Sequence, residues 1–203
     1  MHRTIRLTLT SLLALSLSGC ESSKPIRYYT LQIPPAPTLT TNTYPVSLVV
    51  ANISGTQFFQ DAPIAYRIGV NEIGTYQYSH WSEPPVSLVR RRLIRILRSS
   101  GDYRSVTELG NNADGQFVVR GRLYDFEEVD TASIAGLVSM EFDLCDRKSG
   151  KVLWSHYYSQ SEPVQSKEIS AVVTALDLNL DRGLKEVAAG LGQYFSTTLG
   201  KKS

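Results

Sequence analysis

The sequence predicts a single domain of the α/β (α+β) class, with a mixed or antiparallel β-sheet and two main helices. Three observations lead to this prediction. Strand-length runs rich in β-branched and aromatic residues follow one another between residues 116 and 160, separated by short polar connections. Two longer segments carry apolar residues every three or four positions, which is the spacing of an amphipathic helix. The chain of 203 residues is long enough for one core and contains no internal repeat.

The N-terminal residues have the parts of a secretory signal peptide. Arg3 and Arg6 supply a basic start without any acid, and residues 7–17 are then apolar or small, with only Ser and Thr as polar residues. About eleven such residues make a helix of roughly 16 Å, which is too short for the ~30 Å hydrocarbon core of a bilayer. We therefore expect this segment to be removed.

The segment ends in Leu17-Ser18-Gly19-Cys20, which resembles the lipobox of bacterial lipoproteins. The resemblance implies diacylglycerol on the thiol of Cys20, cleavage between Gly19 and Cys20, and acylation of the new amino group. Several acyl chains, at about 0.8 kcal/mol for each buried methylene, hold a protein stably on a bilayer. An ordinary cleaved signal with an incidental cysteine is the alternative. The expected divisions are a signal peptide over 1–19, a tether over 20–26 and a domain over 27–203.

Composition limits the function classes that remain. Loss of Arg3 and Arg6 lowers the formal net charge from +2 to about zero, which argues against nucleic acid as a partner. With Cys20 outside the fold, Cys145 has no intramolecular partner, and its strand-like surroundings predict a buried or half-buried structural thiol. The fold is therefore expected to stand without a disulfide.

The first half of the domain predicts four strands, recognised by their aromatic and β-branched content. The Pro-rich segment 34–45 can only be a surface connector, and residues 55–63 are expected to form a loop. The strands are expected over 27–33, over 46–53, and on both sides of a turn near 70–72 within 64–81.

A helix is predicted to begin at Ser82 and to end before Gly101. Ser is a good N-cap, Glu83 suits the positive end of the helix dipole, and Pro84 and Pro85 are tolerated only in a first turn. Glycine after the last turn allows a left-handed cap. The expected apolar stripe consists of Val86, Val89, Leu93, Ile96 and Leu97.

The second half predicts an antiparallel meander followed by the longest helix. Residues 166–200 keep helical spacing between their apolar positions. Gly183, Gly190 and Gly192 each cost up to about 1 kcal/mol inside a helix, so the sequence leaves room for a kink or break near Gly183. The meander strands, with a hairpin turn at 147–151, are expected over 116–127, 132–146 and 152–160.

The sequence pattern offers no residues for catalysis or metal binding. His80 and His156 lack a partner at metal-ligand spacing, and there is no HExxH motif, phosphate loop or nucleophile elbow. Glu127, Glu128 and Asp130 cluster at the end of a predicted strand, where the simplest interpretation is a solvated loop. We therefore expect neither an enzyme nor a metal or cofactor.

The run VRRRLIRILRSS places Arg91, Arg95 and Arg98 on one helical face, flanked by Arg90 and Arg92 and opposite the apolar stripe. Two interpretations stay open for this arginine face. It is either the water-exposed side of an amphipathic helix or a surface that meets anionic lipid headgroups or an acidic protein. The planar guanidinium suits phosphate well.

Several motifs occur together in this order. The lipobox is followed by YYTL, the Pro-rich connector, VSLVVANI and IAYRIGVNEIGTYQYSHWSEPPVSLVRRRLIRIL. We expect Tyr29 and Trp81 in the core. The set resembles the ABC-type transport auxiliary lipoprotein family, whereas the second proline and the arginine run are not required by that family. The matching positions are Tyr29, Ile64–Arg67, Tyr76, Trp81–Pro84, Gly121, Leu123 and Phe126.

The resemblance implies a sheet covered on one side by the two helices and a role without catalysis. It implies a periplasm-facing lipoprotein that works with an MCE-domain (mammalian cell entry) protein and an ABC permease in moving lipids between Gram-negative membranes. The lipoprotein is expected to dock the MCE assembly at the outer membrane and to be able to form a homo-oligomer. Glu21 favours the outer membrane, because an inner-membrane retention signal would have Asp there. A direct lipid carrier and a structural lipoprotein of another envelope assembly are the alternatives.

Overall fold

The sheet is organised around β6 (Phe117–Asp130) in a computed structural model that describes residues 24–32, 43–110, 114–131 and 133–200. β7 (Ile134–Asp146) pairs antiparallel with β6 along nearly its whole length, and β8 (Val152–Pro163) pairs antiparallel with β7. These three strands confirm the predicted meander. β6 and β8 continue beyond their expected ends, to Asp130 and Pro163.

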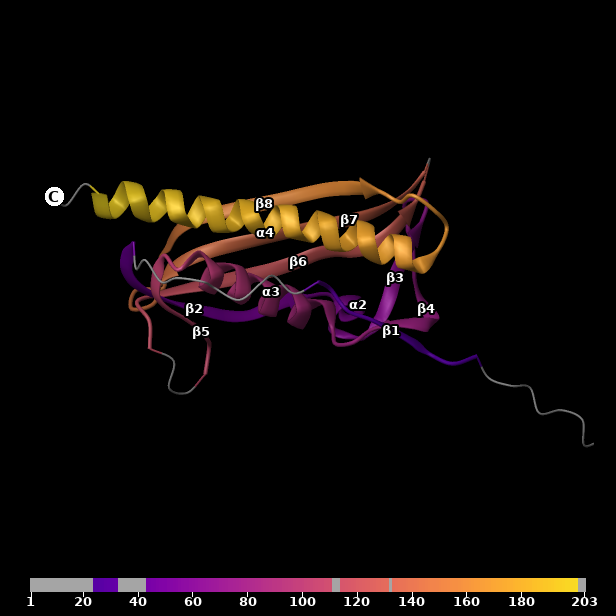
Figure 1. Cartoon of the computed structure of the whole chain (residues 1–203), viewed down its shortest axis with the longest axis horizontal. Coiled ribbons are helices and arrows are strands. Elements are labelled where there is room, and N and C mark those ends of the chain that lie inside the picture. The colour runs from indigo at the N-terminus through magenta and orange to yellow at the C-terminus, as the bar shows by residue number, and fades with distance from the viewer. Residues whose placement is uncertain (1–23, 33–42, 111–113, 132, 201–203) are drawn as a thin grey trace, which may run out of the picture.

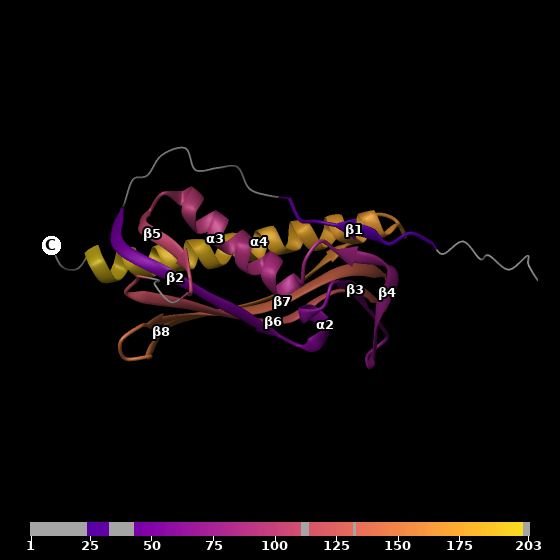
Figure 2. The ribbon, with the colours of Figure 1, turned by 90° about the horizontal axis from the view of Figure 1, so that it is seen from below.

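The opposite edge of β6 is shared by two strands. β2 (Tyr44–Gly55) runs parallel to the first part of β6, and β3 (Pro63–Ile68) runs parallel to its last residues. The sheet therefore divides into two wings, which Figures 1 and 2 show at opposite ends of the molecule. The first wing adds β5 (Tyr103–Glu108), and the second adds β4 (Glu72–Trp81) and β1 (Arg27–Tyr29).

Two helices, α3 (Pro85–Ser100) and α4 (Ile169–Leu199), cover the same face of the sheet, as Figure 2 shows in side view. The mixed sheet with both main helices on one face confirms the predicted fold class. A third, short helix, α2 (Gln57–Gln60), lies where the two wings separate, and its Phe59 is 1% exposed. None of the helices in the described ranges combines the length and hydropathy needed to cross a membrane.

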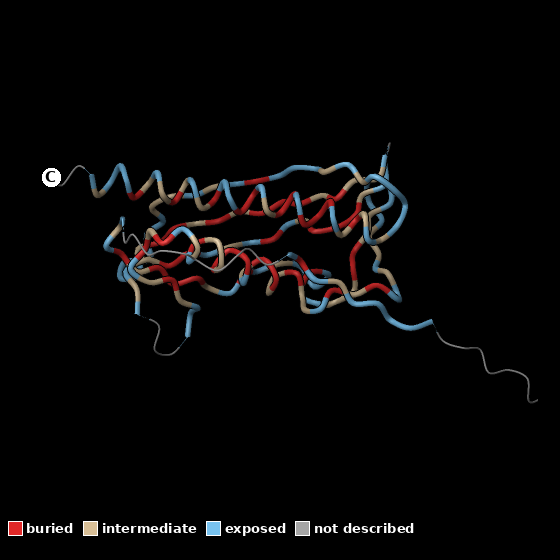
Figure 3. The backbone as a smooth tube through the Cα atoms, viewed as in Figure 1, coloured by how far each residue is buried: buried red, intermediate tan, exposed pale blue. Residues whose placement is uncertain are grey.

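The core lies between α3, α4 and the sheet. Figure 3 shows the buried residues on the inner turns of both helices and along the central strands, with exposed residues on the outer turns. Cys145 is buried as predicted, and burial raises the pKa of its thiol. The largest fully buried side chains are Trp81, Phe59, Phe126, Phe142, Phe195, Leu48, Ile64, Leu93, Leu97, Leu123, Met140 and Leu144.

The structure corrects the expected N-terminal elements in three places. β1 contains only three residues instead of the expected run over 27–33. The expected loop over 55–63 contains α2. β5 was not predicted, because its sequence YRSVTE buries only Tyr103 and Val106 and pairs only with β2. A short edge strand of this kind carries a weak sequence signal.

The start of α3 also differs from the prediction. Pro84, and not Ser82, is the N-cap, and Pro85 begins the helix. The physical reason is that the backbone N–H of Ser82 donates to the carbonyl of Tyr29 at 2.7 Å, so Ser82 still belongs to the strand region. The C-terminal end agrees with the prediction, because Gly101 forms a left-handed cap with φ of 69°.

The long helix α4 begins at Ile169 instead of Ser166 and continues through Gly183 without a break. Gly183 packs directly against the sheet. A Cβ there would meet the methyl group of Met140 and would lie 2.7 Å from the ring of Tyr158. Tyr158 cannot easily move, because it is buried and its hydroxyl donates to Oδ1 of Asn179 at 2.6 Å. Glycine therefore permits close contact between α4 and the sheet.

We predict opposite effects for two glycine substitutions in α4. Gly183→Ala should lower the free energy of unfolding by about 1–3 kcal/mol through overpacking against Tyr158. Gly192→Ala is the control, because its Cβ would have only the hydroxyl of Tyr44 nearby, at 3.8 Å. The control should raise stability by up to about 1 kcal/mol through helix propensity. Urea denaturation measures both, and an equal gain in stability for the two variants would contradict the close packing at Gly183.

Candidate functional site: the N-terminal junction and the helix pair

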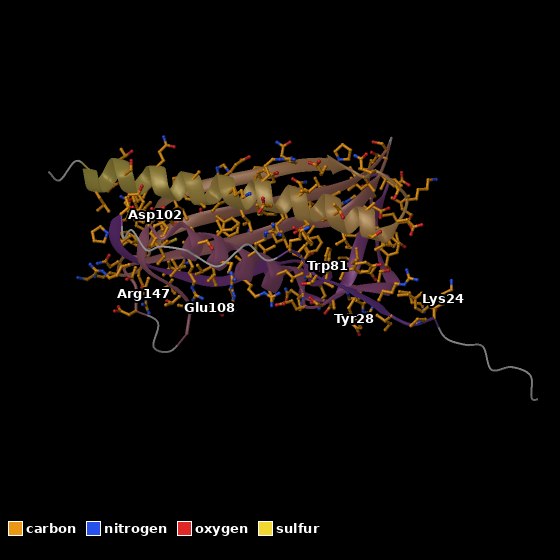
Figure 4. All side chains as sticks on the ribbon, in the orientation of Figure 1. Lys24, Tyr28, Trp81, Asp102, Glu108 and Arg147 are labelled. Carbon is orange, nitrogen blue, oxygen red and sulfur yellow. The ribbon has the colours of Figure 1, made fainter. Side chains whose placement is uncertain are left out.

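The expected lipidation site lies outside the described residues. Cys20 and Gly19 belong to the segment before Lys24, so cleavage and acylation stay predictions. The structure instead describes where the tether enters the fold. Figure 4 places Lys24 and Tyr28 at one end of the molecule, and Asp102 and Arg147 at the other.

The N-terminal strand joins the fold at Trp81. β1 pairs parallel with β4 so that Tyr29 lies opposite Trp81, and the N–H of Trp81 donates to the carbonyl of Ala62 at 2.7 Å. Trp81 is fully buried, with its ring centroid 5.2 Å from that of Phe126. Tyr29 is partly buried and packs against the core. The prediction of a core position is therefore confirmed for Trp81, and Tyr29 lies at its margin.

The other two motif residues, Pro84 and Tyr76, lie after and before Trp81 in the chain. The carbonyl of Pro84 accepts hydrogen bonds from the N–H groups of Ser87 and Leu88, at 2.9 and 3.1 Å, at the first turn of α3. Tyr76 lies earlier in β4 and donates its hydroxyl to Oε2 of Glu128 at 2.8 Å. Burial, and then this hydrogen bond, raises the pKa of Tyr76. We call Tyr29, Trp81 and Pro84 with their backbone bonds the N-terminal junction.

The arginine face of α3 is only partly open to solvent. Arg91 forms an ion pair with Glu83 at 2.5 Å while its side chain stays 54% exposed. Nε of Arg98 donates to the carbonyl of Val106 at 2.8 Å, which ties the helix to β5. Arg95 is of intermediate exposure and also has an interaction partner. These contacts favour a structural role for the face, and contact with lipid or protein stays a prediction.

The placement of Arg92 on the polar side of α3 was wrong. Arg92 is 8% exposed and points toward α4, where it pairs with Asp177 and, at 2.9 Å, with Asp181. The physical reason is its spacing from Val89 and Ile96, which places it within the inner stripe of the helix. The complementary signal was present in α4, where Asp177 and Asp181 lie one helical turn apart and interrupt an apolar stripe.

This ion cluster also holds the segment that follows β1. The backbone N–H of Gln32 donates to Oδ1 of Asp177 at 3.3 Å, beside Leu31, which is buried. Lys185 pairs with Asp181 at 2.7 Å. Burial opposes ionisation of Asp181, but hydrogen bonds from Lys185 and Arg92 outweigh it and lower the pKa of Asp181. We call Arg92, Asp177 and Asp181 the interhelix cluster.

The prediction that Glu127 and Glu128 lie in a solvated loop was also wrong. Both residues lie within β6, where β3 pairs alongside them, and Glu127 is 0% exposed. Nε of Arg67 donates to Oε1 of Glu127 at 2.5 Å, and its Nη2 donates to Asp125 at 3.2 Å. Burial raises the pKa of Glu127, although Arg67 acts against the shift. Asp130 ends the strand and is exposed.

The two histidines outside the signal segment contact aromatic rings. His156 stacks on Trp154 at 5.9 Å between ring centroids and lies 3.5 Å from a carboxylate oxygen of Glu186. His80 meets Tyr28 edge to face at 5.9 Å. Within the described ranges, we find no group of three or more His, Cys, Asp or Glu side chains arranged to hold a metal ion.

We predict that the interhelix cluster is required for stability. Arg92→Met should lower the free energy of unfolding by about 3–5 kcal/mol, because it leaves the buried carboxylate of Asp177 without its cation, while Asp181 keeps its pair with Lys185. Arg91→Met is the matched control on the same helix and should change stability by less than about 1 kcal/mol, as is usual for exposed ion pairs. Chemical denaturation measures both variants. Equal, small effects would show that the buried contact does not hold the helices together.

Comparison with solved structures supports the same fold. Protein XCC0632 from Xanthomonas campestris is 17% identical and matches over 86% of this chain and 99% of its own, with a TM-score of 0.75. An uncharacterized protein is 15% identical over 83% of this chain and 99% of its own, with a TM-score of 0.66. Hypothetical protein CT253 from Chlamydia trachomatis is 12% identical over 76% and 100%, respectively, with a TM-score of 0.50.

These distant structural similarities show only the fold, whereas the match to a family model shows the family. No curated protein matches the sequence. The model of the ABC-type transport auxiliary lipoprotein component matches residues 29–188, from the N-terminal junction into the second half of α4. This range covers most of the domain and includes the motif positions Tyr29, Tyr76, Trp81 and Pro84. The chain therefore belongs to the ABC-type transport auxiliary lipoprotein family.

Proposed function

We propose that this protein is the docking component of an MCE-type ABC system for lipid transport between membranes. It is anchored to the outer membrane through acyl chains on Cys20, faces the periplasm and holds an MCE-domain protein. The observation that carries this proposal is the family match over residues 29–188, together with the lipobox at residues 17–20 upstream of it. Glu21 after the lipidated cysteine favours the outer membrane, and self-association into a homo-oligomer is part of the proposal.

The N-terminal junction suits an anchored domain. A tether can position a domain only if it is joined firmly to the fold. Here the chain passes from Lys24 into β1, which pairs with β4 beside buried Trp81. Gln32 then contacts Asp177 in α4. Both main helices are thus connected to the tether within a few residues. This arrangement supports a role in holding a partner at a fixed position relative to a membrane.

The alternative of a direct lipid carrier has less support. A carrier needs an apolar cavity for acyl chains. One groove on the described residues has a volume of about 510 Å³, is open, and lies on the sheet face away from the helices. Its lining includes Arg120, Arg122, Glu141 and Asp143. A groove with charged walls of this kind suits polar ligands and not acyl chains. Co-purification of a lipid with Cys20→Ala protein prepared without detergent would favour the carrier instead.

We predict that Cys20→Ala leaves a folded protein in the soluble periplasmic fraction that fails to rescue a transport defect. The change removes the acyl chains while all the described contacts of the domain remain. Membrane fractionation and complementation of a deletion strain measure the two effects, with Cys145→Ala as the cysteine control that should stay on the membrane. Full rescue by the unanchored protein would show that the lipid anchor is dispensable.

We predict that an MCE-domain protein is captured with this lipoprotein from chemically crosslinked envelopes. Mass spectrometry of the purified complex identifies the partner, and the same purification from cells that lack the lipoprotein is the control. Recovery of the MCE protein together with its permease would support the docking role. Recovery of an outer-membrane assembly machine instead would contradict it.

A further inference from the structure

The turn between β3 and β4 exposes two aliphatic side chains. Ile68 is 51% exposed and Val70 is 81% exposed, while Asn71 between Val70 and β4 is uncharged. The turn is ordered by Gly69, whose φ of 60° suits a glycine and whose N–H donates to the carbonyl of Asp130 at 3.3 Å. Apolar side chains are thus presented outward by a fixed turn. We call residues 68–71 the hairpin tip.

The hairpin tip lies at the end of the molecule where the tether enters. β3, β4 and β1 occupy this end in Figures 1 and 2, opposite the C-terminal end of α4. Figure 4 places Lys24 and Tyr28 there as well. Two further apolar side chains are exposed at β1, where Ile26 is 45% exposed and Tyr28, opposite His80 in β4, is 65% exposed. Tyrosine is enriched where proteins meet the interface of a bilayer.

The tether has the length that is needed to bring its anchor to the hairpin tip. Because β1 is parallel to β4 and Arg27 lies opposite Ser79, the chain enters β1 from the direction of the hairpin. Arg27 lies seven positions after Cys20, and Ser79 lies seven positions after Glu72. Such a tether spans at most about 25 Å when fully extended. An anchor on Cys20 can therefore lie level with the start of β4, beside the hairpin tip.

The charges near the hairpin tip select the kind of lipid surface. Glu72 and Asp130, both exposed, flank the tip at the ends of β4 and β6. Arg67 on the neighbouring strand is already paired with Asp125 and Glu127. Anionic headgroups would be repelled by these carboxylates, whereas a zwitterionic headgroup offers an ammonium group to them. The complementary surface is a bilayer rich in zwitterionic phospholipid.

We propose that the hairpin tip inserts Ile68 and Val70 into the interface of a zwitterionic bilayer as a second membrane contact. The proposal rests on the lipid anchor of the proposed function, which holds the tip close to the bilayer. Two contacts with the bilayer fix the orientation of the domain, because a single attachment point leaves the domain free to rotate about it. The end of the molecule that carries β5 and the β7–β8 turn then points away from the membrane.

The test uses the full mature chain, lipidated at Cys20, in vesicles of phosphatidylethanolamine and phosphatidylcholine. An environment-sensitive nitrobenzoxadiazole label is attached at Val70→Cys, and the matched control carries it at Val152→Cys, an exposed aliphatic position beside the β7–β8 turn. Buried Cys145 is common to both proteins. We expect a several-fold rise in emission at position 70 in vesicles, with quenching by nitroxide-labelled lipids, and no change at position 152.

A second variant separates insertion from other causes. Ile68→Asp in the protein labelled at position 70 should return its emission to the level of the control, because a charge at the tip opposes burial in the interface. The intact mass of the Cys20 peptide and sedimentation with vesicles report separately on the anchor. Missing acyl chains would overturn the proposed anchor. Sedimenting, lipidated protein with equal emission at positions 70 and 152 would overturn only the insertion of the hairpin tip.

Discussion

Burial of Trp81 is the contact on which the arrangement of this protein depends. Its backbone belongs to β4, its neighbour Tyr29 belongs to β1, and the next residues lead into α3. Complete burial of an aromatic side chain of this size stabilises a fold by about 3 kcal/mol or more. Because this one position joins the N-terminal strand, the hairpin and the first helix, β1 and the helical face are parts of one rigid unit.

The interhelix cluster extends this unit to α4. A buried ion pair adds little stability over an apolar pair of similar size, but removing one of its partners is costly. Its contribution therefore lies in fixing the alignment of the two helices. Arg92 selects one alignment of α3 with Asp177 and Asp181, and Asp177 in turn accepts the bond from Gln32. The segment that follows β1, both helices and the sheet thereby keep one relative orientation. The docking role proposed above would depend on this fixed orientation.

The sequence predicted those elements whose signal is repeated along the chain. The meander of β6, β7 and β8 and the long helix α4 were found because many residues share one period. β5 and α2 are too short for such a signal. β5 forms because it pairs with β2, and α2 forms where the two wings of the sheet separate. Arg92 and Glu127 were misplaced for a related reason. The charge of a side chain suggests solvent, and only the neighbouring element shows the partner that lets it be buried.

The residues of the candidate site also differ in whether a sequence pattern could reveal them. The motif residues Tyr29, Trp81 and Pro84 were singled out by the family pattern, and the structure gives each a structural contact. The arginine face was singled out by composition, and Arg91 and Arg98 hold partners within the chain. The exposed hairpin tip carries no sequence motif. Its importance follows from position, because two aliphatic side chains become notable only beside a membrane tether.

Flotation of the proposed partner with vesicles tests whether this protein docks an MCE-domain protein at a membrane. The lipidated protein is reconstituted into liposomes, the purified periplasmic MCE-domain protein is added, and the mixture is centrifuged through a density gradient. We expect the MCE protein to float with liposomes that carry the lipoprotein and to stay at the bottom with empty liposomes or with Cys20→Ala protein. An MCE protein that stays at the bottom in all three cases would contradict the docking role.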